Sequence, residues 1–455
     1  MARRAAGRSD SPARSPAPTA SRPAALQAPD ADVLVRPALT PTPHPSSQPL
    51  LTALLGAGQA LEIRRVLDEG PGAEDDWPAL HARAEALADT VLRCWHAAGR
   101  PPELVGSVAG SAQQGSGQAG AVQLDVVCSG GGWRNMYCGG AYAVLRALEA
   151  RGCLVVRRAA GASSGALAAA TIGCNAGAAA VQQPQPEQRR RQDCAEGGLI
   201  PCRDWYRLHD AWDILYTRYG FTHYNPVLRG FIRAFYPSDA AERCCASGTA
   251  FSVSVCGASA DPAEQQGGAA GESCEPQGRL GRALGLPQRL LASDFRSFRD
   301  LEGAILASSA LPWIIGQPFF WRWRGYRCLD GGLVDNCPVF ADGKRPQLVI
   351  DLGAVPDSPP LDMLLLRPPR RRVRELWEAG MNDCAAVLTG QADGGGSAAM
   401  RLLATGQTSV AADAAEAEGG WAWVVRLLCV EVPALLGMVL WLLRARFAPR
   451  SIGES

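Results

Sequence analysis

A serine between two glycines is the first residue whose setting suggests chemistry. Gly161-Ala-Ser163-Ser-Gly165 follows a short apolar stretch, 154–156, and leads directly into an Ala-rich stretch with helical character. A G-x-S-x-G pattern between a strand and a helix is typical of a nucleophile elbow, in which a tight turn exposes the serine hydroxyl. The spacing selects Ser163 over Ser164 as the nucleophile, and the helix N-terminus that follows helps to stabilise an oxyanion.

An activated serine needs a base, and histidine is the usual one. The histidines are His44, His81, His96, His209 and His223, and all of them precede Asp330. The Ser–Asp–His order of α/β-hydrolases therefore cannot use Asp330 as its acid. His209 and His223 are interpreted more simply as ordinary histidines of an aromatic-rich region. A carboxylate base is then the economical alternative.

Asp330 is the candidate for that base. It ends a strand-like stretch, and Gly331 and Gly332 follow it, so that another group can approach closely. Asp-Gly is also a common turn dipeptide, and the local sequence by itself favours a plain β-turn. The catalytic interpretation therefore depends on the other motifs.

A glycine-rich loop follows the first apolar strand, 121–128. It contains Gly130, Gly131 and Gly132, and Arg134 comes shortly after. Glycines free backbone N–H groups to point at an anion, which predicts an oxyanion hole with positive charge nearby. The loop is not a P-loop, because no Gly-Lys-Ser/Thr follows it. A flexible strand-to-helix turn is the plainer alternative.

Taken in order along the chain, the glycine loop, the serine elbow and the Asp-Gly-Gly turn resemble the patatin-like phospholipase family. The stretches 307–312 and 330–339 are also similar to that family, and the resemblance covers about 121–390. It implies an α/β fold, a three-layer α/β/α sandwich with a central, mostly parallel sheet. It also implies hydrolysis of lipid acyl esters by a dyad of Ser163 and Asp330.

The resemblance gives the residues around the dyad a role as well. The oxyanion hole would be formed around Gly130, Gly131, Gly132 and Arg134, while Gly161, Gly165, Gly331 and Gly332 support the two turns. No cofactor and no metal is implied. The family usually has glycine after the arginine, where this sequence has Asn135. Asparagine tolerates positive φ better than most residues, so we expect a working but somewhat distorted loop.

Two other functions stay open at this point. One is an acyltransferase that uses the same dyad. The other is a catalytically inactive lipid-binding or scaffold protein, whose distorted glycine loop no longer supports the reaction. A histidine-dependent serine protease is the least favoured alternative.

The elements that must position these residues alternate between strand and helix. Strands are predicted at 121–128 and 154–156, with a helix at 136–150 between them and another after the serine. This alternation predicts a parallel sheet, and right-handed crossovers place both loops at the same end of it. Further strands are predicted at 251–256, 319–323 and 347–352, and low-complexity inserts at 175–198 and 258–285.

The composition changes outside this central domain, 121–390. Residues 1–50 are rich in Arg, Ala, Ser and Pro and are predicted to be a disordered or targeting tail, and 51–120 a helical segment and linker. Residues 391–420 are predicted to be a loose linker. Residues 421–446 are predicted to be an amphipathic or membrane-associated helix. Its apolar part, 421–443, approaches the thickness of a bilayer but contains charges and a proline, so a surface helix, a span and a packed helix stay open.

Charge and cysteine content limit the remaining functions. With 455 residues and a net charge of +1, the chain has no overall field that would draw it to nucleic acid. Fifteen cysteines without a C-x-x-C pair indicate a reducing compartment. We therefore expect an intracellular, membrane-associated protein that meets its lipid substrate at a membrane or lipid-droplet surface. A basic run at 367–374 either contacts anionic lipid or forms a solvated loop.

Overall fold

The structure, a computed structural model, places the central domain and one preceding helix. It describes residues 61, 65, 76–98, 121–181, 199–219, 224–258, 287–310, 320–355, 368–391 and 398–406. The predicted tail, the linker before the first strand, most of both inserts and the C-terminal helix 421–446 lie outside these residues. All described residues belong to one compact unit, Gln48–Ser455.

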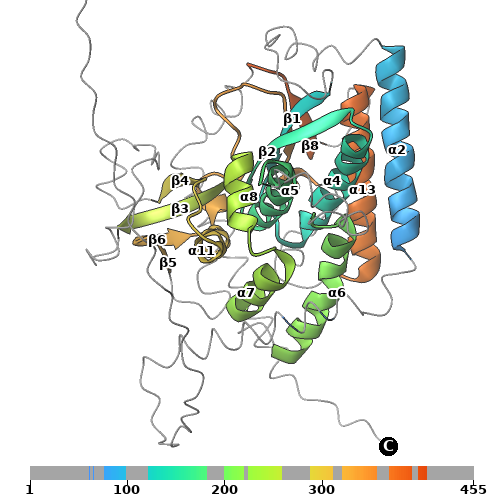
Figure 1. Cartoon of the computed structure of the whole chain (residues 1–455). Helices are drawn as coiled ribbons and strands as arrows, with labels where there is room; N and C mark the ends of the chain where they lie inside the picture. The colour runs from blue at the N-terminus through green and yellow to red at the C-terminus, as the bar shows by residue number, and fades with distance from the viewer. Residues whose placement is uncertain are drawn as a thin grey trace, which may run out of the picture. The chain divides into compact units, whose positions relative to one another are not determined.

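A mixed sheet of eight strands runs through the described residues (Figure 1). Its order is β5-β6-β3-β2-β1-β7-β8, and β4 pairs with β3. The strands are β1 (Val122–Cys128), β2 (Leu154–Ala162), β3 (Ala250–Ala258), β4 (Gln288–Ala292), β5 (Trp321–Trp323), β6 (Tyr326–Leu329), β7 (Gln347–Ile350) and β8 (Met400–Leu403). The four central strands β3, β2, β1 and β7 are parallel, and the outer pairs are antiparallel.

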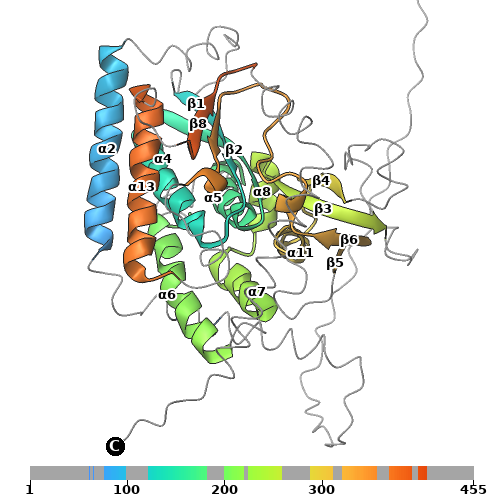
Figure 2. The same ribbon diagram turned by 180° about the vertical axis from the view of Figure 1, so that it is seen from behind.

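Helices flank this sheet. They are α2 (Trp77–Ala97), α4 (Asn135–Ala150), α5 (Ser164–Val181), α6 (Cys202–Tyr219), α7 (Tyr224–Phe235), α8 (Ala240–Ser247), α11 (Phe298–Ser308) and α13 (Arg370–Thr389), with short 3-10 helices η1 (Gly132–Arg134), η4 (Gly331–Leu333) and η5 (Leu352–Ala354). Helix α4 packs against α2 and α13, as both views show (Figures 1 and 2), whereas α5 packs against β2 and α8.

The two faces of the sheet carry two separate apolar clusters. Successive side chains of a strand point to opposite faces, so Val126 of β1 joins the large cluster beneath the helices and Val127 joins a small cluster with Phe340. The chain is thus an α/β sandwich whose mixed sheet is mostly parallel at its centre. The predicted fold class and the predicted alternation over 121–165 are confirmed.

A two-residue turn directly follows the strand predicted at 319–323, of which the structure places Trp321–Trp323 as β5. Arg324 and Gly325 both have positive φ, 48° and 74°, as the turn of a tight hairpin requires. Arg324 is held there by Asp300, to which its Nε donates at 3.0 Å. The chain therefore forms the hairpin β5–β6, and Trp323 is buried in the core while Arg322 is exposed.

Other boundaries differ from the prediction. The first seven residues of the predicted insert 175–198 continue α5, because their many alanines favour a helix. The predicted loose linker 391–420 contains β8, which pairs with β7. The basic run is not a solvated loop but the start of α13, where Arg371 and Arg374 pair with glutamates four residues later. No helix within the described ranges is long and apolar enough to cross a membrane.

Candidate active site

Ser163 occupies the turn between β2 and α5. Its φ is 53°, in the left-handed region that a residue with a side chain adopts only under strain. Its N–H donates to Ser308 Oγ at 2.9 Å. The flanking glycines are needed for space, since a Cβ atom on Gly161 would lie 2.0 Å from the Gly165 oxygen, and one on Gly165 would lie 2.2 Å from the Cys128 oxygen.

The sheet register brings Asp330 to this turn, although 166 residues separate it from the serine. Strand β3 lies between β2 and β6, pairing Ser252 with Ala162 on one side and Ser254 with Leu329 on the other. Asp330 directly follows Leu329, and its carbonyl accepts a hydrogen bond from Ser254 Oγ at 2.7 Å. Strand β3 therefore acts as a spacer that places the carboxylate beside the elbow.

The Asp330 carboxylate is buried, with 4% of the residue exposed. Burial raises its pKa to about 6, while the Ser163 side chain and the Gly332 N–H oppose this shift. Its Oδ1 accepts from Gly332 N at 2.8 Å. Its Oδ2 has no hydrogen bond of normal geometry with any described residue, although the Ser163 hydroxyl is close enough to affect the pKa. This oxygen is therefore available to accept a proton.

The glycine loop lies directly against the serine. A Cβ atom on Gly130 would lie 2.7 Å from Ser163 Cβ, and Gly132 has a φ of 58°, which favours glycine. The N–H of Gly131 donates to Ser164 Oγ at 3.0 Å, on the nucleophile side of the loop. The N–H of Gly130 instead donates to Asn336 Oδ1 at 2.9 Å.

Asn336 links the glycine loop to the segment that carries Asp330. Besides accepting from the N–H of Gly130, its side-chain Nδ2 donates to the Gly130 oxygen at 3.3 Å. The carboxamide thus holds both polar groups of one loop residue. The sequence motif contains Asn336, but nothing in its spacing indicates a partner two hundred residues away.

Arg134 supports the loop with its side chain. The residue is buried, and its Nη1 donates at 3.1 Å to the carbonyl of Leu352, the first residue of η5, which follows β7. Burial, and to a smaller extent the charge of Arg372, lowers the pKa of Arg134. Its guanidinium therefore ties the glycine loop to the sheet, and any electrostatic effect on an oxyanion comes from that position.

Asn135 does not adopt the expected conformation. Its φ is −50°, so it is an ordinary helical residue at the start of α4, and the expectation that it would need positive φ is wrong. The helix begins here directly after η1, so glycine is not required for the backbone. The Asn135 side chain is buried and lines a cavity instead.

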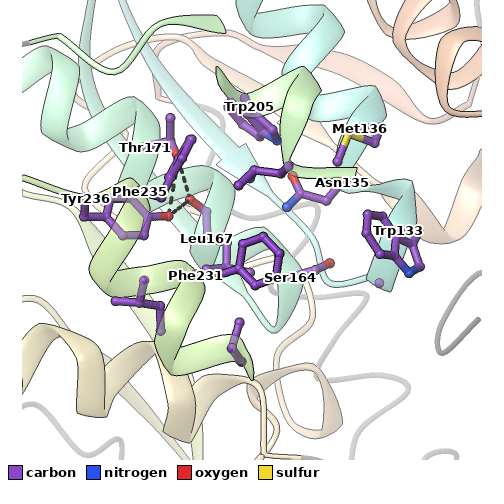
Figure 3. A pocket seen from close by; sticks show the side chains of 14 residues that line it. Trp133, Asn135, Met136, Ser164, Leu167, Thr171, Trp205, Phe231, Phe235 and Tyr236 are labelled. Carbon is purple, nitrogen blue, oxygen red and sulfur yellow. Dashed lines mark hydrogen bonds between the residues drawn. The ribbon is translucent and has the colours of Figure 1, made fainter. Parts of the chain in front are cut away.

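That cavity is partly open to solvent and adjoins the loop and the elbow (Figure 3). One wall is the face of α5 that carries Ser164, Leu167 and Thr171. The opposite wall is the face of α7 that carries Leu228, Phe231, Ile232 and Phe235. Both sets follow helical spacing. The apolar residues of 228–235 recur at helical spacing, so this wall could be recognised from the sequence. The facing residues of α5 could not, because the many alanines of that helix give no distinct face.

The histidines fit the simpler interpretation. His209 is buried, its Nε2 lies 2.8 Å from the Pro368 carbonyl, and its ring packs edge-on against Trp133. His223 lies outside the described residues. Among the residues that the structure places, no group of three or more His, Cys, Asp or Glu side chains could hold a metal ion.

The α/β sandwich therefore brings the serine turn, the glycine loop and the buried Asp330 carboxylate close together. Residues 126–341 match the family model for patatin-like phospholipases, which confirms the resemblance seen in the motifs. These residues thus form a patatin-like phospholipase domain, within a chain of 455 residues. None of the curated proteins compared with the chain matches it.

Proposed function

We propose that this protein hydrolyses carboxylic esters of phospholipids or acylglycerols, with Ser163 as nucleophile and Asp330 as general base. The observation that carries this proposal is the buried Asp330 carboxylate, whose pKa is raised to about 6 and responds to the Ser163 hydroxyl. A base that is ionised at neutral pH but not strongly acidic suits proton transfer. The strained backbone at Ser163 is a further support.

The first step forms an acyl-enzyme. Asp330 Oδ2 accepts the hydroxyl proton as Ser163 Oγ attacks the ester carbonyl carbon, and the carbonyl oxygen becomes an oxyanion. As the tetrahedral intermediate collapses, the bond to the leaving alkoxide breaks and Asp330 returns the proton to it. In the second step a water molecule gives its proton to Asp330, attacks the acyl carbon and releases the carboxylic acid and the serine hydroxyl.

The N–H groups of Gly131 and Gly132 are the favoured oxyanion donors. The N–H of Gly130 is engaged by Asn336, whereas that of Gly131 is held by the hydroxyl of Ser164 in the absence of substrate. The substrate oxygen would replace this hydroxyl. Loss of one such donor typically costs about 2.7–4 kcal/mol of transition-state stabilisation.

The cavity would hold the acyl chain. It meets the glycine loop at Gly132 and the elbow at Ser164, and its walls on α5 and α7 are largely apolar. A lipid with its ester at Ser163 would therefore extend its chain between these helices. Such a substrate resides in a membrane or lipid droplet, so we propose that the protein works at that surface inside the cell.

The test combines covalent labelling with product analysis. A fluorophosphonate probe should label the wild-type protein at Ser163, and Ser163→Ala should abolish both labelling and ester turnover. Ser297→Ala is the matched control, because Ser297 caps α11 at the surface and should affect stability only. Products from phospholipids, galactolipids and triacylglycerols would identify the substrate class. Undiminished turnover in Ser163→Ala, or a wild-type protein that is never labelled, would refute the proposal.

A further inference from the structure

Three hydroxyl groups that line the cavity already have hydrogen-bond partners. Tyr236 and Thr171 close one end of it, where the Tyr236 hydroxyl donates to the Leu167 carbonyl at 2.8 Å and Thr171 Oγ1 donates to the same carbonyl at 3.0 Å. Ser164 Oγ accepts from the N–H of Gly131. These groups need nothing from a ligand.

The Asn135 side chain differs from these hydroxyl groups. Only 8% of the residue is exposed, and its Oδ1 is buried without a hydrogen-bond partner in the described part of the chain. Figure 3 shows the carboxamide pointing from α4 into the space near Trp205 and Phe231. A buried unsatisfied amide is costly, and native proteins rarely contain one without a reason. A leucine at this position would avoid the cost, so the amide points to a ligand.

The position of Asn135 fixes which part of a ligand it would meet. It follows Gly132, a favoured oxyanion donor, by three residues along the 3-10 helix η1, which is about 6 Å of helix rise. Both residues line the cavity. An ester oxygen held at Gly132 would therefore place the first few carbons of the acyl chain beside the Asn135 side chain.

We propose that the acyl group taken into this cavity carries a hydroxyl on its second or third carbon, and that this hydroxyl donates to Asn135 Oδ1. The inference rests on the proposed function. A carboxamide both accepts and donates, as a hydroxyl does. A charged group does not fit, because none of the described lining residues is charged and the ion would be buried without a partner.

The test compares hydroxylated and plain chains in one substrate series. Monoacylglycerols with a decanoyl chain, or the same chain with a hydroxyl on its second or third carbon, are hydrolysed by wild-type protein and kcat/KM is measured. We expect the wild-type protein to prefer a hydroxylated chain by at least about ten-fold, since a site with a buried polar group rejects an analogue that leaves it unpaired. Asn135→Leu should reverse this preference.

Met136→Leu is the matched control, because Met136 lines the same cavity and the change is apolar to apolar. It should retain the preference, and thermal unfolding should show that both variants are folded. A wild-type protein without preference overturns the inference. So does an Asn135→Leu variant that loses activity equally on plain and hydroxylated chains, since Asn135 would then act on the ester or the fold.

A binding measurement separates this inference from the proposed hydrolysis. Calorimetry on Ser163→Ala compares the uncharged decanamide with its hydroxylated forms. Tighter binding of a hydroxylated amide, lost when Asn135→Leu is added, supports the inference even if no ester is cleaved. Equal affinity for the plain and hydroxylated amides, or no binding of either, overturns it, even where Ser163-dependent hydrolysis is found.

Discussion

Asp330 meets two opposing demands at the residue level. It must be ionised to accept a proton, yet burial disfavours its charge and raises its pKa to about 6. Below that pH the carboxyl is protonated and cannot act as a base, so kcat/KM should rise with pH through about 6 and then level off. The profile is measured on a water-soluble ester, and the rate of fluorophosphonate labelling should follow it. A profile that is flat between pH 5 and 8 would contradict the assignment.

The same burial makes the ionised Asp330 carboxylate destabilising for the fold. Its folded-state pKa of about 6 exceeds the ordinary value of 3.8. The group's contribution to stability is therefore complete below the ordinary pKa and is lost as the pH rises through 6. The loss amounts to about 3 kcal/mol.

Asp330→Asn should escape this loss, because an amide does not titrate. We expect the variant to be inactive but to gain about 3 kcal/mol relative to the wild-type protein between about pH 4 and pH 7. Urea unfolding of both proteins at the two pH values measures the difference. A stability difference that is independent of pH would show that the Asp330 pKa is not raised.

The residues with local motifs were predictable from the sequence, and those with distant partners were not. Ser163 and Asp330 could be recognised from the sequence, because each lies next to glycines that its turn requires. Asn336 and Ser308 act through contacts with Gly130 and Ser163, and these contacts exist only after the sheet has formed. Asn135 was noticed, but its backbone was misjudged, because only the structure shows that α4 begins there.

At the level of elements, α5 carries the serine at its start and also forms a wall of the cavity. Leu167 and Thr171 follow Ser164 on one face, and the Thr171 end is closed by its contact with Tyr236. The distance from Ser164 to Thr171 is about two helical turns, or roughly 10 Å. The helix would therefore limit the length of the acyl chain that fits.

Leu167→Phe should shorten the accepted chain, because it adds bulk about one turn after the serine. We expect kcat/KM to fall about ten-fold or more for long acyl chains and to change little for short ones. A series of esters of increasing length measures this. Leu87→Phe on α2, outside the cavity, is the control and should leave the profile unchanged. A uniform loss across all lengths would argue against α5 as the length limit.

The elements themselves were predictable where a regular pattern was long enough. The alternation from β1 to α5 was found because apolar runs and glycine turns follow one another closely. Strand β8 has only four residues and follows a glycine-rich stretch, so its composition suggested a linker. The charge run at the start of α13 suggested a loop, because its pairing with Glu375 and Glu378 depends on helical geometry.

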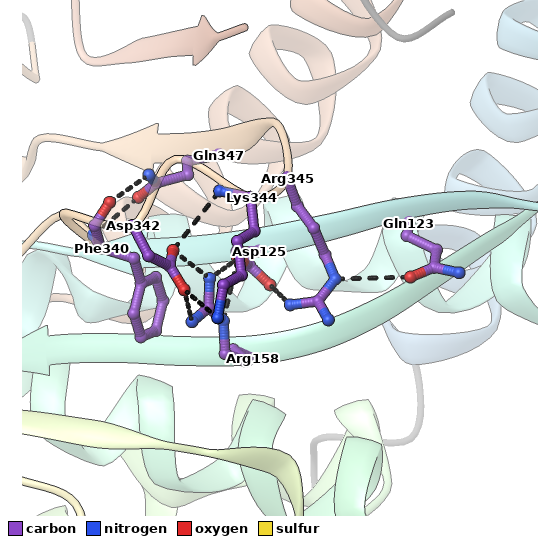
Figure 4. Close-up of polar contacts among 8 residues, drawn as sticks. All are labelled: Gln123, Asp125, Arg158, Phe340, Asp342, Lys344, Arg345 and Gln347. Carbon is purple, nitrogen blue, oxygen red and sulfur yellow. Dashed lines mark hydrogen bonds and ion pairs between the residues drawn. The ribbon is translucent and has the colours of Figure 1, made fainter. Parts of the chain in front are cut away.

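At the level of the whole molecule, an ion-pair network fastens the segment after the Asp330 turn to the sheet (Figure 4). Asp125 of β1 is fully buried and accepts from Arg158 Nε at 3.0 Å, and Arg345 lies 3.5 Å from its other oxygen. Arg158 also pairs with Asp342 at 2.8 Å and lies over the Phe340 ring. The network thus joins the central strands β1 and β2 to the segment that contains Phe340 and Asp342 and covers the small apolar cluster.

The two aspartates that share Arg158 should differ in their effect on stability. Asp125 is fully buried and faces the partly exposed side chains of Arg158 and Arg345, so Asp125→Asn leaves two cations with less compensation and should cost about 3 kcal/mol. The Asp342 side chain is 30% exposed, so Asp342→Asn should cost about 1 kcal/mol or less. Urea unfolding measures both, and added salt should diminish only the Asp342 effect. Equal losses would mean that burial does not determine the strength of this network.

A double replacement tests whether the ion pair of Asp125 and Arg158 itself stabilises the fold, or whether two apolar side chains of similar size stabilise it as well. Replacing both partners of a buried ion pair by apolar residues of similar size is often neutral, whereas removing one partner is not. Asp125→Leu together with Arg158→Met should therefore recover much of the stability lost in Asp125→Asn, provided that Phe340 still packs on the new side chain. If the double variant is less stable than Asp125→Asn, the pairing with Asp342 and Arg345 contributes more than the buried pair itself.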